Sequence, residues 1–293
     1  MKTNNDNSGK LIVLGTPIGN LGDFSSRGIQ ALRDSDLIAA EDTRITRKLL
    51  HRFDIRSKHL LSYFEYSGNG RLKIILKKIL DGKDVVFVSD AGMPTISDPG
   101  ENLIKECINS GIKIEVVPGP SALTAALAVS GLSTRRFTFE GFLSKNKKQR
   151  KKHLEELKNE KRTMVFYESP HNLFTTLDCL FELFGNRKIS ICRELTKIYE
   201  EIIRTTLSCA KQLYKDKKAI GEFVLVVEGK EPHQNQGTLK VEDVVLLAQN
   251  LIKQGQSINN AAKETAKQTG FKKSDIYKAL LKNLAVNNTL EFF

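Results

Sequence analysis

The first 118 residues alternate short apolar runs with amphipathic segments. The apolar runs are four residues long, and Gly, Pro or Asp borders each of them: Leu11–Leu14, Leu37–Ala40, Val85–Val88 and Ile114–Val117. Between them, apolar residues recur at helical spacing in Ser26–Arg33, Arg44–His51, Arg71–Leu80 and Glu101–Asn109. This alternation predicts an α/β lobe over residues 11–118, with a mostly parallel sheet that binds ligands beyond the carboxyl ends of its strands.

A second α/β lobe is predicted over residues 119–230. It starts at the Pro118-Gly119-Pro120 break and a helix of small residues over Ser121–Ser130. Predicted strands then occupy Phe137–Glu140, Thr163–Tyr167, Lys188–Cys192 and Glu222–Glu228. Predicted helices lie at His171–Phe184 and Leu207–Tyr214.

The two ends of the chain differ from these lobes. Residues 1–10 are polar and are expected to be disordered, and residues 231–238 have the composition of a linker. Residues 239–293 form a helical module, in which Ala266, Gly270 and Ile276 have the spacing of a helix-turn-helix. The same spacing also arises by chance in helices rich in Ala and Lys.

Composition narrows the class of protein. No apolar stretch approaches the ~20 residues of a membrane span, and Met1–Lys10 lacks the apolar core of a secretion signal. The four cysteines are widely separated and have no metal-ligand spacing, so reduced thiols are expected and a metal is not. We therefore expect a cytoplasmic protein without a membrane partner.

Positive charge favours a polyanionic partner. The formal net charge is +12, and nine basic against three acidic side chains in residues 144–162 supply half of it. A run of charges is also typical of a simple solvated face.

Four loops rich in Gly, Pro and small polar residues follow the predicted strands: Gly15–Asp23, Glu41–Arg44, Ser89–Gly100 and Pro118–Ala122. Glycine lets a backbone approach a ligand closely, and the free amides of such loops need partners. Neither a Gly-x-Gly-x-x-Gly motif nor a phosphate-binding Gly-Lys-Ser/Thr motif occurs in the first loop, so a nucleotide phosphate is not indicated.

The second loop has two interpretations. Its adjacent carboxylates and guanidinium, Glu41, Asp42 and Arg44, can hold or deprotonate a hydroxyl group at the end of a strand. Alternatively, Asp42 is the N-cap of a helix and Arg44 is solvated.

The loops occur in an order that carries a resemblance. Gly-Thr-Pro-Ile-Gly-Asn-Leu-x-Asp, Ala-Ala-Glu-Asp-Thr-Arg, Val-Ser-Asp-Ala-Gly-x-Pro, Asp-Pro-Gly, Pro-Gly-Pro-Ser-Ala, Glu-Gly-Phe-Leu and Phe-Tyr-Glu-Ser-Pro-His follow one another between residues 10 and 230. This series closely resembles the ribosomal RNA small subunit methyltransferase I family, part of the tetrapyrrole methylase superfamily. The tail is similar to the C-terminal extension of that family.

The resemblance implies the two-lobed fold of class III methyltransferases with a C-terminal helix-turn-helix-like module. It implies S-adenosylmethionine as the cofactor, bound between the lobes. By similarity, the cofactor would contact Asp90, Ala91, Gly92, Met93, Pro94, Ile96, Ser97, Ser121, Ala122, Tyr167, Gly221 and Glu222.

The implied reaction is methylation of a cytidine ribose 2′-hydroxyl in the decoding centre of 16S rRNA, with free rRNA or the 30S subunit as partner. Transfer from a sulfonium is mainly a problem of alignment, and a carboxylate that accepts the proton assists it. Asp42 and Glu168 are the candidates, and Arg44 would hold a phosphate or orient the carboxylate. The expected RNA contacts are Pro17, Asn20, Lys147, Lys148, Arg150, Lys151 and Lys152. Relatives are commonly dimers, so a homodimer is expected.

Two positions depart from the family pattern. Phe64-Glu65-Tyr66-Ser67 replaces a usual His-x-His-Asn, and Asn172 replaces a usual Arg. Both changes remove polar or cationic groups that would face RNA.

Two rival functions share some of these features. A precorrin-type C-methyltransferase would have the same cofactor loops but no use for a basic tail. A non-enzymatic nucleic-acid-binding protein would act through the helix-turn-helix and use the lobes to sense a small molecule.

Overall fold

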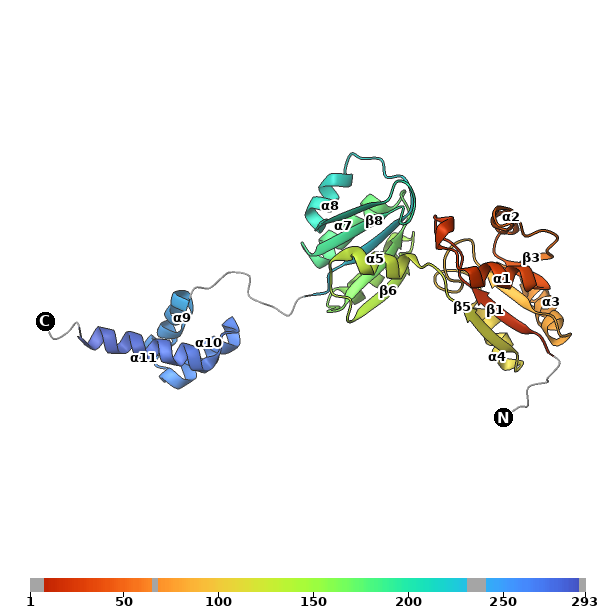
Figure 1. Cartoon of the computed structure of the whole chain (residues 1–293). Helices are drawn as coiled ribbons and strands as arrows, with labels where there is room; N and C mark the ends of the chain where they lie inside the picture. Colours follow the sequence, from red (N-terminus) through yellow and green to blue (C-terminus); the bar gives the residue numbers. More distant parts are fainter. Residues whose placement is uncertain (1–7, 65–67, 231–240, 290–293) are drawn as a thin grey trace. The chain divides into compact units, whose positions relative to one another are not determined.

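The computed structural model describes residues 8–64, 68–230 and 241–289 (Figure 1). The chain divides into two compact units, Met1–Lys230 and Glu231–Phe293, and each is described by itself. No helix within the described ranges is both long enough and apolar enough to cross a membrane.

The first lobe contains a five-stranded, fully parallel sheet in the order β3-β2-β4-β1-β5. Its strands are β1 (Lys10–Leu14), β2 (Leu37–Ala40), β3 (Leu60–Ser62), β4 (Val85–Val88) and β5 (Lys113–Val117). The four predicted strands are confirmed, and β3 is an addition. Lys10 already belongs to β1 although we expected it to be disordered, and residues 1–7 lie outside the described ranges.

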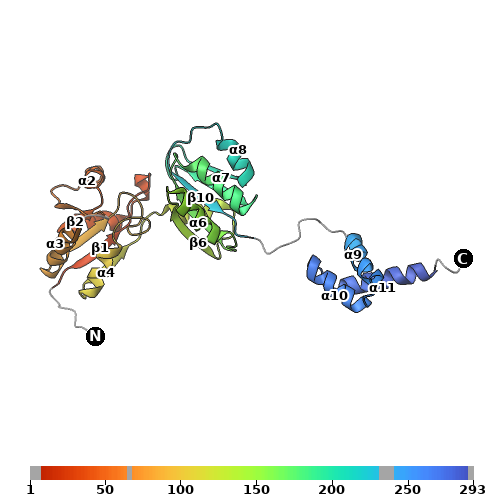
Figure 2. The same cartoon turned by 180° about the vertical axis from the view of Figure 1, so that it is seen from behind.

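Four helices cover the two faces of this sheet (Figure 1, Figure 2). They are α1 (Ser26–Asp34), α2 (Thr43–Arg52), α3 (Gly68–Leu80) and α4 (Glu101–Asn109). In β1, Leu11 and Val13 belong to the core under α3 and α4, whereas Ile12 and Leu14 belong to the core under α1 and α2. Burial on both faces explains why β1, β2 and β4 contain unbroken apolar runs.

The second lobe contains a mixed sheet in the order β6-β7-β10-β8-β9. Its strands are β6 (Phe137–Phe142), β7 (Thr163–Glu168), β8 (Lys188–Arg193), β9 (Glu201–Thr206) and β10 (Phe223–Val227). Only β6 and β7 pair in parallel. The sequence did not predict β9, because its residues are polar or half-buried and lack a clean alternation.

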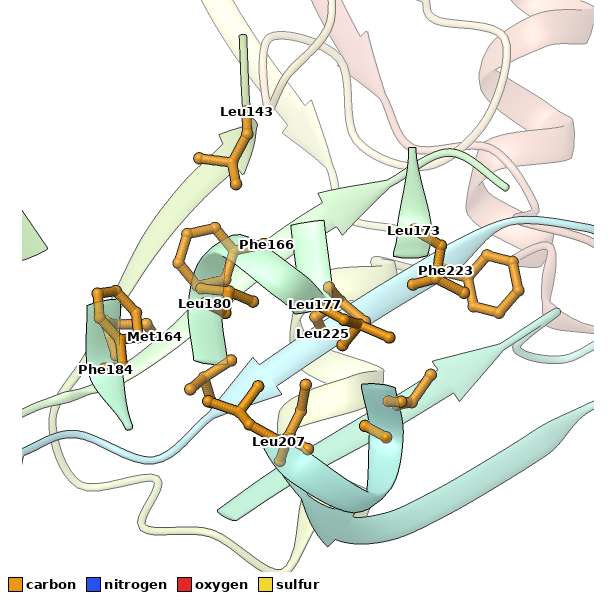
Figure 3. Packing of buried hydrophobic residues seen from close by; sticks show 14 of the residues in the cluster. Leu143, Met164, Phe166, Leu173, Leu177, Leu180, Phe184, Leu207, Phe223 and Leu225 are labelled. Carbon is orange, nitrogen blue, oxygen red and sulfur yellow. The ribbon is translucent and has the colours of Figure 1, made fainter. Parts of the chain in front are cut away.

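One helix, α5 (Ala122–Ser130), packs on one face of this second sheet. The opposite face carries α6 (Lys147–Leu157), α7 (Leu173–Phe184) and α8 (Leu207–Tyr214). Figure 3 shows Phe166 from β7, Leu177 from α7 and Leu225 from β10 meeting in the core on that side, and all three are fully buried. This core fixes the strand ends that reach the functional site.

The second unit is a bundle of α9 (Val241–Lys253), α10 (Ile258–Thr269) and α11 (Lys273–Thr289). Gly270 ends α10 with a φ of +77°, a left-handed conformation that favours glycine. Ile276 of α11 is buried against α9 and α10, and Ala266 packs beside it. Gly270 therefore makes the predicted turn, and Ala266 and Ile276 make the predicted contact between helices. The predicted linker, residues 231–238, lies outside the described ranges.

Candidate functional site

Three of the four loops meet at the carboxyl ends of β1, β4 and β5. Thr16 and Gly92 exchange backbone hydrogen bonds of 2.9 and 3.1 Å, which join the first loop to the third. The Gly119 N–H donates to the Met93 Sδ at 3.3 Å, which joins the third loop to the fourth. A Cβ atom on Gly15 would lie 2.6 Å from that sulfur and 2.7 Å from the Gly119 Cα. Glycine at position 15 therefore allows the loops to meet.

A cavity of about 320 Å³ lies between these loops and the second lobe, and we call it the interlobe cavity. This volume is within the usual range for small-molecule sites. Its walls combine loop residues of the first lobe with the ends of β7, β8 and β10 and their following loops. They are Ile18, Ala91, Gly92, Met93, Ile96, Ser97, Asp98, Ser121, Ala122, Phe142, Tyr167, Glu168, Ser169, Pro170, Cys192, Leu195, Glu222, Phe223 and Val224.

Most of the residues predicted to touch a cofactor line this cavity. They are Ala91, Gly92, Met93, Ile96, Ser97, Ser121, Ala122, Tyr167 and Glu222. The loops on which they lie come from four separate stretches of sequence, and the fold brings them to one place. Gly92 has a φ of +78°, so the backbone itself requires glycine there.

Three other predicted cofactor residues lie outside the walls of the interlobe cavity. Asp90 instead accepts the Asp42 N–H at 3.0 Å and so ties the second loop to the third. Pro94 is a buried residue of the third loop. Gly221 has a φ of +99°, and a Cβ there would lie 2.6 Å from the Glu194 Cγ. The absence of a side chain at Gly221 leaves room for Glu194. The Glu194 carboxylate can therefore accept the Glu222 N–H at 2.9 Å.

Several wall residues were not expected from the sequence, including Ile18, Asp98, Phe142, Leu195 and Val224. Leu195 and Val224 belong to the buried core around α5, and nothing in a single sequence separates such residues from ordinary core. Asp98 stood inside the quoted Asp-Pro-Gly motif, which was the available signal.

Tyr167 is held in the wall of the interlobe cavity by contacts within the second lobe. Its hydroxyl oxygen accepts the Leu123 N–H of α5 at 3.1 Å. The rings of Phe139 and Phe142 pack edge-on against it, with centroids at 4.9 and 5.6 Å. Burial raises the pKa of the Tyr167 hydroxyl, so it stays neutral at physiological pH.

The contacts of Asp42 argue against the role of proton acceptor that the sequence suggested. Its carboxylate caps α2 by accepting the Arg44 N–H at 2.8 Å, and it pairs with the Arg44 guanidinium at 2.6 Å. These hydrogen bonds lower the pKa of Asp42 to about 2, which makes it a weak base. Asp42 also lines neither the interlobe cavity nor the two cavities beside α2 and α4. The alternative interpretation, a helix N-cap, is what the structure shows.

Glu168 lies in the wall of the interlobe cavity, and only 5% of it is exposed. Its carboxylate accepts the Ser169 N–H at 2.7 Å and the Thr176 hydroxyl at 2.5 Å. Thr176 is a buried residue of α7, so these bonds hold the start of α7 to the end of β7. Glu168 is thus placed near the site, with its oxygens engaged by its neighbours.

A second cavity of about 270 Å³, the α2 cavity, lies between the first loop and helix α2. Thr16, Pro17, Lys48, Arg52 and Asp90 are among its walls. Pro17, which was predicted to contact RNA, therefore lines the α2 cavity. Thr16 is 2% exposed and its hydroxyl has no hydrogen-bond partner in the described part of the chain.

A third cavity of about 920 Å³, the α4 cavity, lies beside the start of α4. It shares three wall residues with the interlobe cavity: Ser97, Asp98 and Phe142. Glu41 lines it as well, and burial is the main cause of the raised pKa values of Glu41 and Asp98. The interlobe and α4 cavities therefore adjoin at Asp98, whose pKa is raised above that of a solvated aspartate.

The basic residues expected to bind RNA all lie on α6, and all of them except Arg150 are exposed. Lys147, Lys148, Lys151 and Lys152 are exposed. Arg150 is only 7% exposed and reaches the Ser144 carbonyl oxygen at 3.5 Å, so it cannot present its guanidinium to a partner. The prediction of Arg150 as an RNA contact is wrong, because it lies on the inward face of α6.

Other predicted positions have structural roles or lie outside the described ranges. Asn20 accepts the Gly22 N–H at 2.9 Å and caps a short 3₁₀ turn. Phe64, one of the departures from the family pattern, lines the α4 cavity, whereas residues 65–67 are not described. Asn172 precedes α7. Within the described ranges, His, Cys, Asp and Glu side chains form no cluster that could hold a metal ion.

Comparison with known proteins agrees with this arrangement. The family model for tetrapyrrole (corrin/porphyrin) methylases matches residues 10–210. Ribosomal RNA small subunit methyltransferase I of Thermotoga maritima is 50% identical over 223 residues, which are 76% of this chain and 100% of that protein. The protein of the same name from Halalkalibacterium halodurans is 44% identical over 279 residues, 93% of this chain and 94% of that one.

A solved structure shows the same fold. Uroporphyrin-III C-methyltransferase of Thermus thermophilus, complexed with S-adenosyl homocysteine, matches with a TM-score of 0.53 and 14% identity. The match covers 76% of this chain and 98% of that one. The expected two-lobed α/β fold is thereby confirmed.

Proposed function

Because the chain belongs to the tetrapyrrole methylases and, within them, to the ribosomal RNA small subunit methyltransferase I family, we propose that it methylates a ribose 2′-hydroxyl of a cytidine in the decoding centre of 16S rRNA. The methyl donor in this proposal is S-adenosylmethionine. The observation that carries the proposal is the interlobe cavity, whose walls include residues from most of the family's loop motifs.

The walls of the interlobe cavity fit this donor. Ile18, Met93, Leu195 and Val224 give an apolar surface suited to an adenine ring. Asp98, Glu168 and Glu222 place carboxylates around the same space, which suits the positive charges of a sulfonium and an amino group. No metal ligand set is required, because the donor supplies a methyl group that is already activated.

The chain's contribution to the reaction is alignment of the donor and the substrate. The interlobe cavity adjoins the larger α4 cavity at Ser97, Asp98 and Phe142, so a substrate in one can reach a donor in the other. Holding oxygen, carbon and sulfur in line replaces a bimolecular encounter and supplies much of the rate enhancement.

The cationic faces of the first unit support an RNA substrate. Helix α6 exposes four lysines, and α2 exposes Arg47, Lys48 and Arg52 without an acidic residue of its own. Lys48 and Arg52 also line the α2 cavity beside the first loop. Such groups bind the phosphate backbone irrespective of sequence, and the 2′-hydroxyl chemistry then distinguishes RNA from DNA.

A methylation assay tests the proposal. The protein is incubated with labelled S-adenosylmethionine and 30S subunits purified from cells that lack this modification. The label is expected in 16S rRNA at one cytidine of the decoding centre, where the linkage becomes resistant to alkaline hydrolysis. Label on a base, on a tetrapyrrole precursor such as uroporphyrinogen, or on no RNA at all contradicts the proposal.

Two further expectations belong to this proposal. A substrate of this kind places the enzyme in the cytoplasm, where ribosomal subunits assemble. We also propose a homodimer, and light scattering coupled to size-exclusion chromatography measures its mass directly against the 32.9 kDa of one chain.

A further inference from the structure

The junction of the interlobe and α4 cavities has an unusual backbone. Thr95 and Ser97, just before Asp98, have φ values of +74° and +62°, which side-chain-bearing residues rarely adopt. Gly100 follows with a φ of +128°, and a Cβ there would lie 2.3 Å from the Phe87 ring. Packing therefore holds a strained loop, and such strain concentrates at functional sites.

The loop places one carboxylate between two spaces. Asp98 lines both the interlobe cavity and the α4 cavity, together with Ser97 and Phe142. Phe142 comes from the other lobe, where a register shift in β6 before Gly141 brings this strand to the loop. A Cβ on Gly141 would lie 3.1 Å from the Ser97 hydroxyl oxygen. Asp98 thus lies where the two lobes meet.

The groups around Asp98 favour proton uptake. Burial raises the pKa of Asp98, the Ser89 hydroxyl lowers it, and the negative charge of Asp90 raises it. Glu41 and Tyr167 face the same carboxylate, since its charge affects both of their pKa values. The remaining charged groups in the walls of the two cavities are Glu168, Glu222, Glu101 and Lys105.

Aromatic rings line the α4 cavity. Phe64 is 47% exposed and Phe142 is 59% exposed, while Tyr63, which also lines the cavity, is only 6% exposed. Exposed aromatic faces stack on the unpaired bases of single-stranded RNA. A ribose, a base and an entry path fit in about 920 Å³, whereas the interlobe cavity has room for one small molecule.

We propose that the α4 cavity receives the target nucleotide, that Phe64 stacks on its base, and that Asp98 is the catalytic residue that accepts the proton of its 2′-hydroxyl. This inference rests on the proposed function and names the substrate subsite for it. The ribose O2′ forms a bond to the methyl carbon, and the carbon–sulfur bond breaks with its electron pair going to sulfur. The hydroxyl proton passes to a carboxylate oxygen of Asp98, so charge and atoms balance.

The first test is the single-turnover methylation rate of 30S subunits at saturating S-adenosylmethionine, measured from pH 9 down to the lowest pH at which the subunits stay intact. Asp98→Asn is expected to lower this rate by roughly 10²- to 10⁴-fold, the usual contribution of a positioned base. In the wild type the rate should fall as the pH drops and Asp98 is protonated, and this acid limb should be absent in Asp98→Asn. Asp98→Glu, which restores a carboxylate, should recover part of the rate.

Asp81→Asn is the matched control, because Asp81 is an exposed turn residue that lines neither cavity. It should match the wild type. An Asp98→Asn rate within about threefold of the wild type overturns the inference. Complete loss of cofactor binding in a folded Asp98→Asn protein, measured by calorimetry, also overturns it and assigns Asp98 to the cofactor.

The second test does not depend on turnover or on the folding of Asp98 variants. Phe64→Ala should weaken the affinity for 30S subunits, measured by filter binding with S-adenosylhomocysteine present, by roughly 5- to 150-fold. Phe137→Ala, a strand β6 residue of 41% exposure outside the three cavities, is the aromatic control. Equal affinities for the two variants overturn the subsite. If the wild type binds and methylates no 30S subunit, the proposed function fails instead.

Discussion

Thr16 and Gly92 are joined by two backbone hydrogen bonds, and they line different cavities. Thr16 belongs to the α2 cavity and Gly92 to the interlobe cavity. The bridge thus forms a wall between the space proposed for the cofactor and the space beside the cationic helix α2. We expect a shift of the Thr16 or Gly92 backbone in one cavity to move its hydrogen-bonded partner in the other cavity.

Gly92→Val tests the importance of this wall. Its φ of +78° is unfavourable for any residue with a Cβ, and a β-branched residue is worse than alanine. An added Cβ would meet a methyl group of Ile18 at 3.4 Å and the Pro120 carbonyl oxygen at 3.6 Å, so the damage comes mainly from the backbone conformation. The variant should lose measurable S-adenosylmethionine binding in calorimetry.

Gly111→Val separates local strain from an effect on the cavity. Gly111 has a similar φ of +68° and no atom within 4 Å of an added Cβ, and it lies in the turn after α4. It should lose stability by an amount like that of Gly92→Val but keep its cofactor affinity. Equal cofactor affinities in the two variants would remove Gly92 from the binding site.

The Asp42–Arg44 pair is expected to support helix α2 rather than catalysis. Asp42→Asn keeps an N-cap side chain, so the methylation rate should stay within about threefold of the wild type. The folded-state pKa of Asp42, about 2, is below its usual value of 3.8. The pair therefore stabilises the fold fully above pH 3.8 and loses this effect as the pH falls toward 2.

Urea unfolding of wild type and Asp42→Asn checks this behaviour. The difference between their midpoints should be largest at neutral pH and should narrow as the pH falls below 4. A methylation rate reduced a hundredfold in a folded Asp42→Asn protein would restore Asp42 as a candidate base.

The exposed lysines of α6 are expected to contact RNA phosphates. Changing Lys147, Lys148 and Lys152 together to Gln should reduce the salt dependence of 30S affinity, with the slope of log K against log salt smaller by roughly 2. Lys151 is left unchanged because Glu155 lies 3.9 Å from its Nζ. Cofactor affinity should not change.

Lys73, Lys77 and Lys78 provide the matched control for this variant, since they are three exposed lysines on α3. Their replacement by Gln should leave the salt slope nearly as in the wild type. If both triple variants give the same slope, the α6 lysines form a solvated face only.

Removal of the second unit should leave the cofactor site intact. Residues 241–289 have their own buried core, and 76% of this chain matches the whole length of the Thermotoga maritima relative. A chain ending at Lys230 should unfold cooperatively and bind S-adenosylmethionine within about threefold of the full-length protein. A truncated chain that folds but does not bind would place the tail at the site.

Much of the fold follows from the apolar pattern. Strands β1, β2 and β4 are buried on both faces, and their uninterrupted apolar runs make them visible in the sequence. Strands β3 and β9 are half-buried, so their composition does not separate them from loops. The inward position of Arg150 is visible in retrospect, because Arg150, Leu154 and Leu157 share one helical face.

The site was predictable only in part. Nine of the twelve predicted cofactor residues line the interlobe cavity, and seven of these nine come from the glycine-rich loops, which are local features of the sequence. The importance of Asp98 depends on Phe142 from the other lobe and on burial by the assembled fold, which no local pattern contains. Asp42 shows the converse, since its partner Arg44 is two residues away and the N-cap interpretation was available from the sequence.

The most direct test of the whole account is a crystal structure with S-adenosylmethionine or S-adenosylhomocysteine bound. We predict electron density for the ligand in the interlobe cavity, in contact with Gly92, Ser121 and Tyr167 and with its sulfur near Asp98. Density for the ligand at any other place, with these residues packed only against each other, would contradict the assignment of the site.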